Sequence, residues 1–199
     1  DNIKQADTAV LFGYVGSRYH GLQKHQNGPP TIEKDLESAM VKAGLINYPK
    51  GSLKRDKDGF LNGDLTKCNW SHASRTDKGV HAVGQCVALE LPGPPPRASA
   101  DQHFAGMTEM VNRRLAEQAR EVWNAEGAEI RVYGMKQVRR GFYDERRLDK
   151  GGSGPAVTRF DARRDATGRL YEYQCPAAAL VRRTATGGGL GGGRITQEE

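Results

Sequence analysis

Chemically active side chains are concentrated in one short stretch of the chain, Ser74–His81, which reads SRTDKGVH. If this stretch is extended, side chains at i and i+2 project to the same side, so Arg75 and Asp77 can form an ion pair. A neighbouring guanidinium keeps a carboxylate ionised and oriented, as a carboxylate nucleophile or base requires in a partly desolvated cleft. The spacing therefore indicates acid–base or nucleophilic chemistry at Asp77, although exposed Arg/Asp pairs without such a role are common.

The element that must hold Asp77 in place is the strand that follows it. Residues from Val80 to Leu91 read VHAVGQCVALEL, small and apolar on both faces, which predicts a central strand buried from two sides. Gly79 permits a backbone turn that a side chain would obstruct, so Asp77 is expected at the lip of this strand. Loops at sheet edges commonly carry functional residues.

Two more strands and two helices are predicted around this central strand. Apolar, β-branched and aromatic residues predict a first strand over Thr8–Val15, and another strand begins at Glu129. Thr31 is the expected N-cap of a helix that ends near Ala43, and apolar residues at helical spacing predict a second helix over Gln102–Arg120. The alternation predicts an α/β or α+β sandwich with helices covering one face of a sheet.

Three regions outside these elements carry weaker patterns. Tyr48–Asn69 is rich in Lys, Asp, Gly and Asn with little periodicity, and is predicted to be a long surface excursion. A further strand is predicted around Leu170–Gln174, because these residues alternate apolar and polar side chains. The tail, which ends in GGGLGGGRITQEE, is of low complexity.

The cysteines indicate a reducing compartment. Cys68, Cys86 and Cys175 form no even, closely spaced framework, so free thiols are expected. Cys68 and Cys86, together with His72 and His81, allow a zinc site to be drawn across the Ser74–His81 stretch. Structural zinc sites usually have tighter and more regular ligand spacing, so two half-buried thiols and two ordinary histidines are expected instead, with no metal.

The composition favours a nucleic-acid partner. The chain has 199 residues, a formal net charge of +6 and a pI near 9.3, and such a charge attracts polyanions. No apolar segment approaches the roughly 20 residues that span a bilayer, so no membrane association is expected. Nothing at the start reads as a signal peptide, although the chain opens at Asp1 without a methionine. Arginines gather in the second half: Arg139, Arg140, Arg146, Arg147, Arg159, Arg163, Arg164, Arg169, Arg182 and Arg183.

The motif itself closely resembles the signature of the TruA family of tRNA pseudouridine synthases, which reads Arg-Thr-Asp-(Ala or Lys)-Gly-Val-His-Ala followed by Gly-Gln. The matching residues here are RTDKGVHAVGQ. Other blocks resemble the family in the same order: GYVGSRYHGLQ its first strand and turn, TIEKDLESAMVKAGLI its first helix, and FDARRDATGRLYEYQCP a later segment. Together they cover Thr8–Pro176. Lys78 and the helix end KAGLI are more similar to the eukaryotic Pus-type branch than to the bacterial enzymes.

The resemblance implies a reaction and a role for each matching residue. In this family uridine becomes its carbon-linked isomer, pseudouridine, without a cofactor. The essential carboxylate corresponds to Asp77, which either attacks covalently or assists a glycal-like intermediate. Arg75 corresponds to the arginine that pairs with this carboxylate and helps hold the flipped nucleotide. Tyr171 corresponds to the tyrosine that stacks on the target base and is a candidate for late proton transfer at carbon 5. Tyr173 is expected in the core, and His81 is expected to buttress the loop.

The resemblance also implies an RNA-facing surface and tRNA as the partner. Loop residues and basic residues near the predicted catalytic strand are expected to contact RNA, mainly through its phosphates and shape. These RNA-binding candidates are Arg18, Tyr19, Lys24, His25, Lys78, Arg163, Arg164 and Arg169.

The chain also departs from the family pattern. Family members build the catalytic cleft between two halves, whereas the recognisable sequence ends near Pro176. The expected organisation is an incomplete TruA-like domain over 1–176, with an α+β fold of mainly antiparallel sheet and helices on one face. Residues 177–199 are a tail or the remnant of a second half. YDERRLDKGGSGPAVTR is an insertion that lengthens a hairpin, and Asp161 stands where Asn or His is usual.

Two readings of the function therefore stay open. One is a tRNA pseudouridine synthase in the nucleus or a mitochondrion. The other is a catalytically silent RNA-binding scaffold derived from the family, for example within a ribonucleoprotein. Retention of Arg75, Asp77 and Tyr171 favours the enzyme, because a degenerate relative would often lose the nucleophile first. Homodimerisation is left open by the sequence.

Overall fold

A computed structural model of the protein describes residues 4–25, 28–138, 142–143 and 157–174. The chain divides into two compact units, Asp1–Thr167 and Gly168–Glu199. The first unit contains every helix and strand assigned in the described residues. The second contributes residues 168–174 to the description. The predicted domain boundary at residue 176 stays a prediction.

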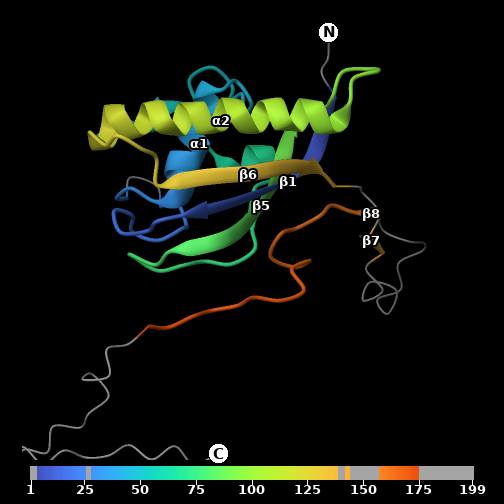
Figure 1. The fold of residues 1–199 in the computed structure, drawn as a ribbon. Helices are drawn as coiled ribbons and strands as arrows, with labels where there is room; N and C mark the ends of the chain where they lie inside the picture. Colours follow the sequence, from blue (N-terminus) through green and yellow to red (C-terminus); the bar gives the residue numbers. More distant parts are fainter. Residues whose placement is uncertain (1–3, 26–27, 139–141, 144–156, 175–199) are drawn as a thin grey trace, which may run out of the picture. The chain divides into compact units, whose positions relative to one another are not determined.

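The first unit is built on an antiparallel sheet (Figure 1). Its strands in spatial order are β4 (Ser71–His72), β5 (Ala82–Pro92), β1 (Gln5–Tyr14) and β6 (Ile130–Gln137). The two long central strands pair along their whole length, from Gln5 opposite Pro92 to Tyr14 opposite Ala82. This arrangement confirms the α+β fold and the mainly antiparallel sheet expected from the sequence.

Two helices, α1 (Ile32–Lys42) and α2 (Ala100–Trp123), cover one face of this sheet (Figure 1). Thr31 caps α1 as predicted, because its side chain accepts a hydrogen bond from the Lys34 amide. The core lies between sheet and helices, and apolar side chains at every second strand position meet apolar helix faces there. It includes Val10, Phe12, Val87, Leu89, Leu36, Met40, Val111, Leu115 and Val132.

The other face of the sheet is partly exposed, which corrects the prediction that β5 is buried from two sides. Val83 is 90% exposed and Leu11 is 49% exposed, whereas Val87 and Leu91 on the helix side are fully buried. In the described part of the unit both helices lie on one face of the sheet, and Val83 and Gly84 at the start of β5 are exposed.

The surface excursion predicted over Tyr48–Asn69 is more ordered than expected. It contains β2 (Lys54–Arg55), β3 (Leu61–Asn62) and a short 3₁₀ helix, η1 (Leu65–Cys68). Phe60 is fully buried, with its ring centroid 5.9 Å from that of Trp123. Ser38 of α1 accepts a hydrogen bond from the Leu61 amide at 3.0 Å. Phe60 therefore anchors the segment to α2 and the Leu61 amide anchors it to α1, which periodicity does not reveal.

The last predicted elements have different outcomes. β7 (Phe142–Tyr143) and β8 (Val157–Thr158) pair as an antiparallel ladder at the two ends of the insertion, as expected for a lengthened hairpin. The predicted strand over Leu170–Gln174 is wrong: residues 168–174 have no regular secondary structure. A strand is stable only when another strand satisfies its backbone groups, and no described strand pairs with this segment.

Candidate active site

Asp77 lies in the loop between β4 and β5, and its side chain is exposed. The Val80 amide donates a hydrogen bond to the Asp77 carbonyl at 3.2 Å, which closes a turn over Lys78 and Gly79. Gly79 has φ +80°, the left-handed region in which glycine avoids the strain of a side chain. The predicted turn and the place of the carboxylate at the start of the strand are therefore confirmed.

A second loop, residues 16–23 after β1, holds the Asp77 loop in place. The Leu22 amide donates to the Thr76 carbonyl at 3.0 Å, and the Gly79 amide donates to the Tyr19 carbonyl at 3.2 Å. The Gly16 amide donates to Nδ1 of His81 at 3.1 Å, which supports the buttressing role expected for His81. The two sequence blocks GYVGSRYHGLQ and SRTDKGVHA are thus joined on either side of Asp77.

Two glycines allow this close approach. A Cβ on Gly21, which has φ +88°, would lie 2.5 Å from the Thr76 carbonyl oxygen. A Cβ on Gly16 would lie 2.0 Å from the Val80 carbonyl oxygen. Any side chain at either position would push the two loops apart.

The sheet contributes further contacts that the sequence analysis did not assign. The phenol of Tyr14, at the end of β1, lies 2.7 Å from Oγ1 of Thr76. Nε2 of the buried Gln85 donates to the carbonyl of Ser74 at 3.2 Å and to its hydroxyl at 3.0 Å. Gln85 is the glutamine of the Gly-Gln pair in the signature, so the signal for its role was present in the sequence.

The predicted ion pair between Arg75 and Asp77 is not formed in this structure, although both residues are described. Nη1 of Arg75 instead donates to Oε1 of Gln23 at 3.0 Å, across to the neighbouring loop. Residues 74–77 are outside the strands, so the rule that places i and i+2 on one side does not apply to them. Both residues are exposed.

Two of the predicted RNA contacts are corrected by burial. Tyr19 is 2% exposed, and its hydroxyl donates to Oδ2 of Asp35 at 2.6 Å, so its ring belongs to the core. Nζ of Lys24 is paired with the buried carboxylate of Glu37 at 2.5 Å and also donates to the Gly63 carbonyl at 2.7 Å. Its side chain is only 10% exposed, so Lys24 has a structural role.

Other candidates remain on the surface. His25 and Lys78 are exposed; Lys78 directly follows Asp77, and His25 comes two residues after the 16–23 loop. Arg18 is 44% exposed and pairs with Glu129 at 3.1 Å. The basic residues Arg139, Arg140, Arg146, Arg147, Arg182 and Arg183 lie outside the described residues.

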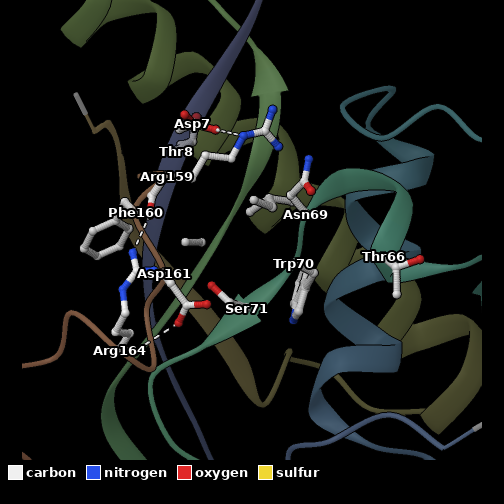
Figure 2. A pocket seen from close by; sticks show the side chains of 12 residues that line it. Asp7, Thr8, Thr66, Asn69, Trp70, Ser71, Arg159, Phe160, Asp161 and Arg164 are labelled. Carbon is white, nitrogen blue, oxygen red and sulfur yellow. Dashed lines mark hydrogen bonds and ion pairs between the residues drawn. The ribbon is translucent and has the colours of Figure 1, made fainter. Parts of the chain in front are cut away.

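Arg164 lines a pocket of about 540 Å³ on the first unit (Figure 2), and Arg163 precedes Arg164 in the chain. Arg159 pairs there with Glu90 at 2.5 Å, and Nε of Arg164 pairs with Asp165 at 3.0 Å. Carboxylates therefore already engage the two guanidiniums that line the pocket, which disfavours a phosphate there. No residue of the Ser74–His81 loop lines it.

Asp161 organises the turn beside this pocket. Its Oδ1 accepts hydrogen bonds from the amides of Arg163 and Arg164 at 2.9 and 3.0 Å. The Ala162 amide donates to the hydroxyl of Ser71 in β4 at 3.0 Å, which attaches the turn to the sheet. The aspartate that departs from the family pattern is thus a turn-forming residue.

The second unit holds Arg169, Tyr171 and Tyr173. Arg169 is exposed, and Tyr171 is 55% exposed. Tyr173 is 87% exposed, so its predicted core role is wrong, because the strand that was to bury it is absent.

The zinc site drawn from the sequence is not assembled. The described residues contain no group of three or more His, Cys, Asp and Glu side chains that could hold a metal ion. Nδ1 of His72 contacts Glu33 at 2.8 Å, and His81 accepts the Gly16 amide. Cys68 and Cys86 are free, and burial raises the pKa of the Cys68 thiol to about 11. Among the described helices, none is long and apolar enough for a transmembrane span.

Comparisons with known proteins bear on this site. No family model matches the chain. The tRNA pseudouridine synthase 1 of Schizosaccharomyces pombe is 45% identical over 175 residues, which cover 87% of the chain and 23% of that protein. The protein of the same name from Kluyveromyces lactis is 31% identical over 175 residues, with 87% and 22% covered. The human pseudouridylate synthase 1 homolog is 30% identical over 142 residues, with 70% and 26% covered.

The antiparallel sheet, the helices on one of its faces and the loop that presents Asp77 are consistent with a fragment of a pseudouridine synthase. The matches confirm the resemblance found in the sequence: most of the chain is similar to tRNA pseudouridine synthases of eukaryotes. It spans about a quarter of the length of these curated relatives.

Proposed function

We propose that the protein converts uridine to pseudouridine in tRNA and that Asp77 is its catalytic carboxylate. The names of the relatives support the reaction and the substrate. The observation that carries the proposal is the exposed Asp77 on a loop fixed from two sides, by the Thr76 contacts to Leu22 and to Tyr14. A carboxylate that reacts must be reachable by substrate yet held in one orientation.

The proposed reaction is an isomerisation and is balanced without a cofactor. The bond between N1 of uracil and C1′ of the ribose breaks, the base turns, and C5 bonds to C1′. The proton leaves C5 and N1 gains one, so no oxidant or reductant is required. Asp77 either attacks covalently or removes a proton on the route to a glycal-like intermediate, and both routes use the same exposed carboxylate.

Other residues take supporting roles in this proposal. Arg75, now bonded to Gln23, contacts the flipped nucleotide or its phosphate, because a uridine inside a tRNA helix must leave its stack to reach Asp77. Tyr171 stacks on the target base. Lys78 and His25, which are exposed, contact tRNA phosphates, with Arg163 and Arg169 as further candidates. Arg18 and Arg164 contribute only if they leave Glu129 and Asp165, the carboxylates with which they pair.

The proposal is tested with the complete protein and tRNA transcripts. Asp77→Asn is expected to lower turnover by about a thousandfold or more, while tRNA affinity stays near that of wild type. Asp101→Asn, an exposed aspartate in the first turn of α2, is the matched control and keeps full activity. Pseudouridine is mapped by carbodiimide labelling, and binding is measured by filter retention.

The two readings left open by the sequence give different results in this experiment. Normal turnover by Asp77→Asn would remove this carboxylate from the mechanism. Binding of tRNA by wild type without any pseudouridine would favour the silent scaffold. The names of the relatives do not favour that second reading.

A further inference from the structure

Glu33 is a buried carboxylate in the first turn of α1, with a side chain only 4% exposed. Its Oε2 accepts the Lys24 amide at 2.8 Å. Its Oε1 accepts Nε1–H of Trp70 at 2.8 Å and lies 2.8 Å from Nδ1 of His72. Because a carboxylate is an acceptor only, Nδ1 of His72 carries the proton in this contact.

Removing the Glu33 carboxylate from water costs free energy, so its burial needs a physical reason. Burying a carboxylate is unfavourable unless donors replace the water that it loses, and three donors do so here. An apolar residue at this helix position would pack without that cost. Glu33 is therefore better explained by what its donors hold in place than by its contribution to stability.

The three donors come from the two segments that flank the catalytic loop. Trp70, drawn beside Ser71 in Figure 2, directly precedes β4, and His72 is the last residue of β4, three residues before Arg75. Lys24 directly follows the 16–23 loop, in which the Leu22 amide donates to the Thr76 carbonyl. The carboxylate of Glu33 thus accepts hydrogen bonds from both flanks.

The backbone of α1 strengthens the same connection. The amides of Ile32 and Glu33, which have no partner within the helix, donate to the carbonyls of Gly21 at 3.2 Å and Leu22 at 3.0 Å. The segment 21–24 is therefore bound to the start of α1 by main-chain contacts in one direction and by the Glu33 carboxylate in the other.

We propose that Glu33 is a positioning residue that sets the place of Asp77 by joining both flanks of its loop to α1. This inference rests on the proposed function for its effect on turnover, but its effect on the loop is independent of it. Glu33 is too deeply buried to touch a substrate. It acts through Leu22 and Thr76 on one side and through the Trp70–His72 segment on the other.

The test replaces Glu33 by glutamine in the complete protein. Glu33→Gln keeps the shape but sets an amide NH₂ against one of the three donors, so one flank is released. Hydrogen exchange of the amides in 74–81 is expected to rise about tenfold or more. The kcat for tRNA is expected to fall about tenfold or more, with KM within about twofold of wild type.

The matched control is Glu37→Gln, on the next turn of the same helix. Glu37 is equally buried, and it also accepts three hydrogen bonds, from Nζ of Lys24, the hydroxyl of Tyr48 and the amide of Gly63. These bonds hold the 48–63 segment and the ammonium group of Lys24, and none of them involves the backbone on either side of the Asp77 loop. Glu37→Gln is expected to lower stability while exchange of 74–81 and kcat stay within about twofold of wild type.

A milder variant decides the matter if Glu33→Gln does not fold. Trp70→Phe removes a single donor and is expected to raise loop exchange and lower kcat in the same sense, by about threefold. Unchanged exchange of 74–81 in the folded variants, or an equal rise in Glu37→Gln, would overturn the positioning role. An inactive wild type would overturn the proposed function instead, and the exchange data would still decide the role of Glu33.

Discussion

The phenolic oxygen of Tyr14 lies 2.7 Å from Oγ1 of Thr76, which joins the end of β1 to the residue before Asp77. Burial raises the pKa of Tyr14, so its phenol stays protonated at neutral pH and either hydroxyl can donate to the other. The Asp77 loop is therefore fixed to the sheet by a side chain as well as to the 16–23 loop by main-chain contacts.

Tyr14→Phe is expected to loosen this loop. The ring stays in the core, but Thr76 loses its partner, which costs about 0.5–1.5 kcal/mol of stability and lowers single-turnover pseudouridine formation severalfold. Tyr48→Phe removes a similar buried phenol, bonded to Glu37 at 2.6 Å, and is expected to cost stability without slowing the reaction. Equal rates for wild type and Tyr14→Phe would show that the Thr76 contact does not position Asp77.

Gly21→Ala and Gly44→Ala separate backbone strain from loop contact. Both glycines have positive φ, +88° and +74°. A Cβ at Gly44 meets nothing within 4 Å, whereas one at Gly21 would lie 2.5 Å from the Thr76 carbonyl oxygen. Gly44→Ala is expected to cost about 1 kcal/mol and to keep full turnover.

Gly21→Ala adds the displacement of Thr76 to the same strain. Its cost is expected to exceed that of Gly44→Ala by about 1 kcal/mol or more, with a turnover loss of about tenfold or greater. Chemical denaturation measures the first quantity and pseudouridine mapping the second. Identical behaviour of the two variants would mean that the loops adjust to the extra carbon.

Local signals in the sequence were sufficient for the main elements. The Thr31 cap, helical spacing of apolar residues and the apolar strand runs placed both helices and the three long strands within a few residues of their observed ends. These signals depend on near neighbours, which is why they can be read from one sequence. The position of Asp77 came from the motif and its family resemblance, with Gly79 supporting a turn.

The errors concern contacts between residues far apart in the chain. Tyr19 and Lys24 lie in a polar loop and were expected to face RNA, but Asp35 and Glu37 of α1 draw their polar ends inward. Phe60 is buried although its segment has no apolar period. The strand at Leu170–Gln174 had a suitable pattern and no partner. Burial and strand pairing are set by tertiary neighbours, which local composition does not specify.

Asp35→Asn is expected to change the pH dependence of stability. Burial raises the pKa of Asp35, with hydrogen bonds from Tyr19 and Gln118 opposing the shift. The folded state then binds more protons than the unfolded state above the ordinary value of 3.8, so the stability contributed by the protonated carboxyl falls as pH rises from there through the raised pKa.

The free energy of unfolding falls by about 1.4 kcal/mol for each unit by which the pKa of Asp35 is raised. Asn at this position does not titrate, so it shows no such fall. The stability advantage of wild type over Asp35→Asn should therefore be greatest near pH 4 and should shrink toward pH 7. Urea unfolding of both proteins across this range measures it. Parallel curves would show that the carboxyl titrates alike in the folded and unfolded states.

Lys78→Ala and Lys24→Met should affect tRNA binding and stability in opposite ways. Lys78 is exposed next to Asp77, so its removal is expected to weaken tRNA binding. A single phosphate contact contributes about 0.7–0.9 to the slope of log K against log salt, and the slope should fall by that amount. Lys24 is instead paired with the buried Glu37, and Lys24→Met leaves that carboxylate without its cation at a cost of about 3 kcal/mol.

The salt slope of Lys24→Met should equal that of wild type at temperatures where both are folded. Affinities measured between low and moderate salt, together with denaturation curves, separate these effects. A reduced slope for Lys24→Met with unchanged stability would mean that Lys24 leaves Glu37 to meet RNA. Because the ion pair is nearly excluded from water, that exchange would have to overcome the desolvation of Glu37, which tRNA phosphates outside the core cannot offset.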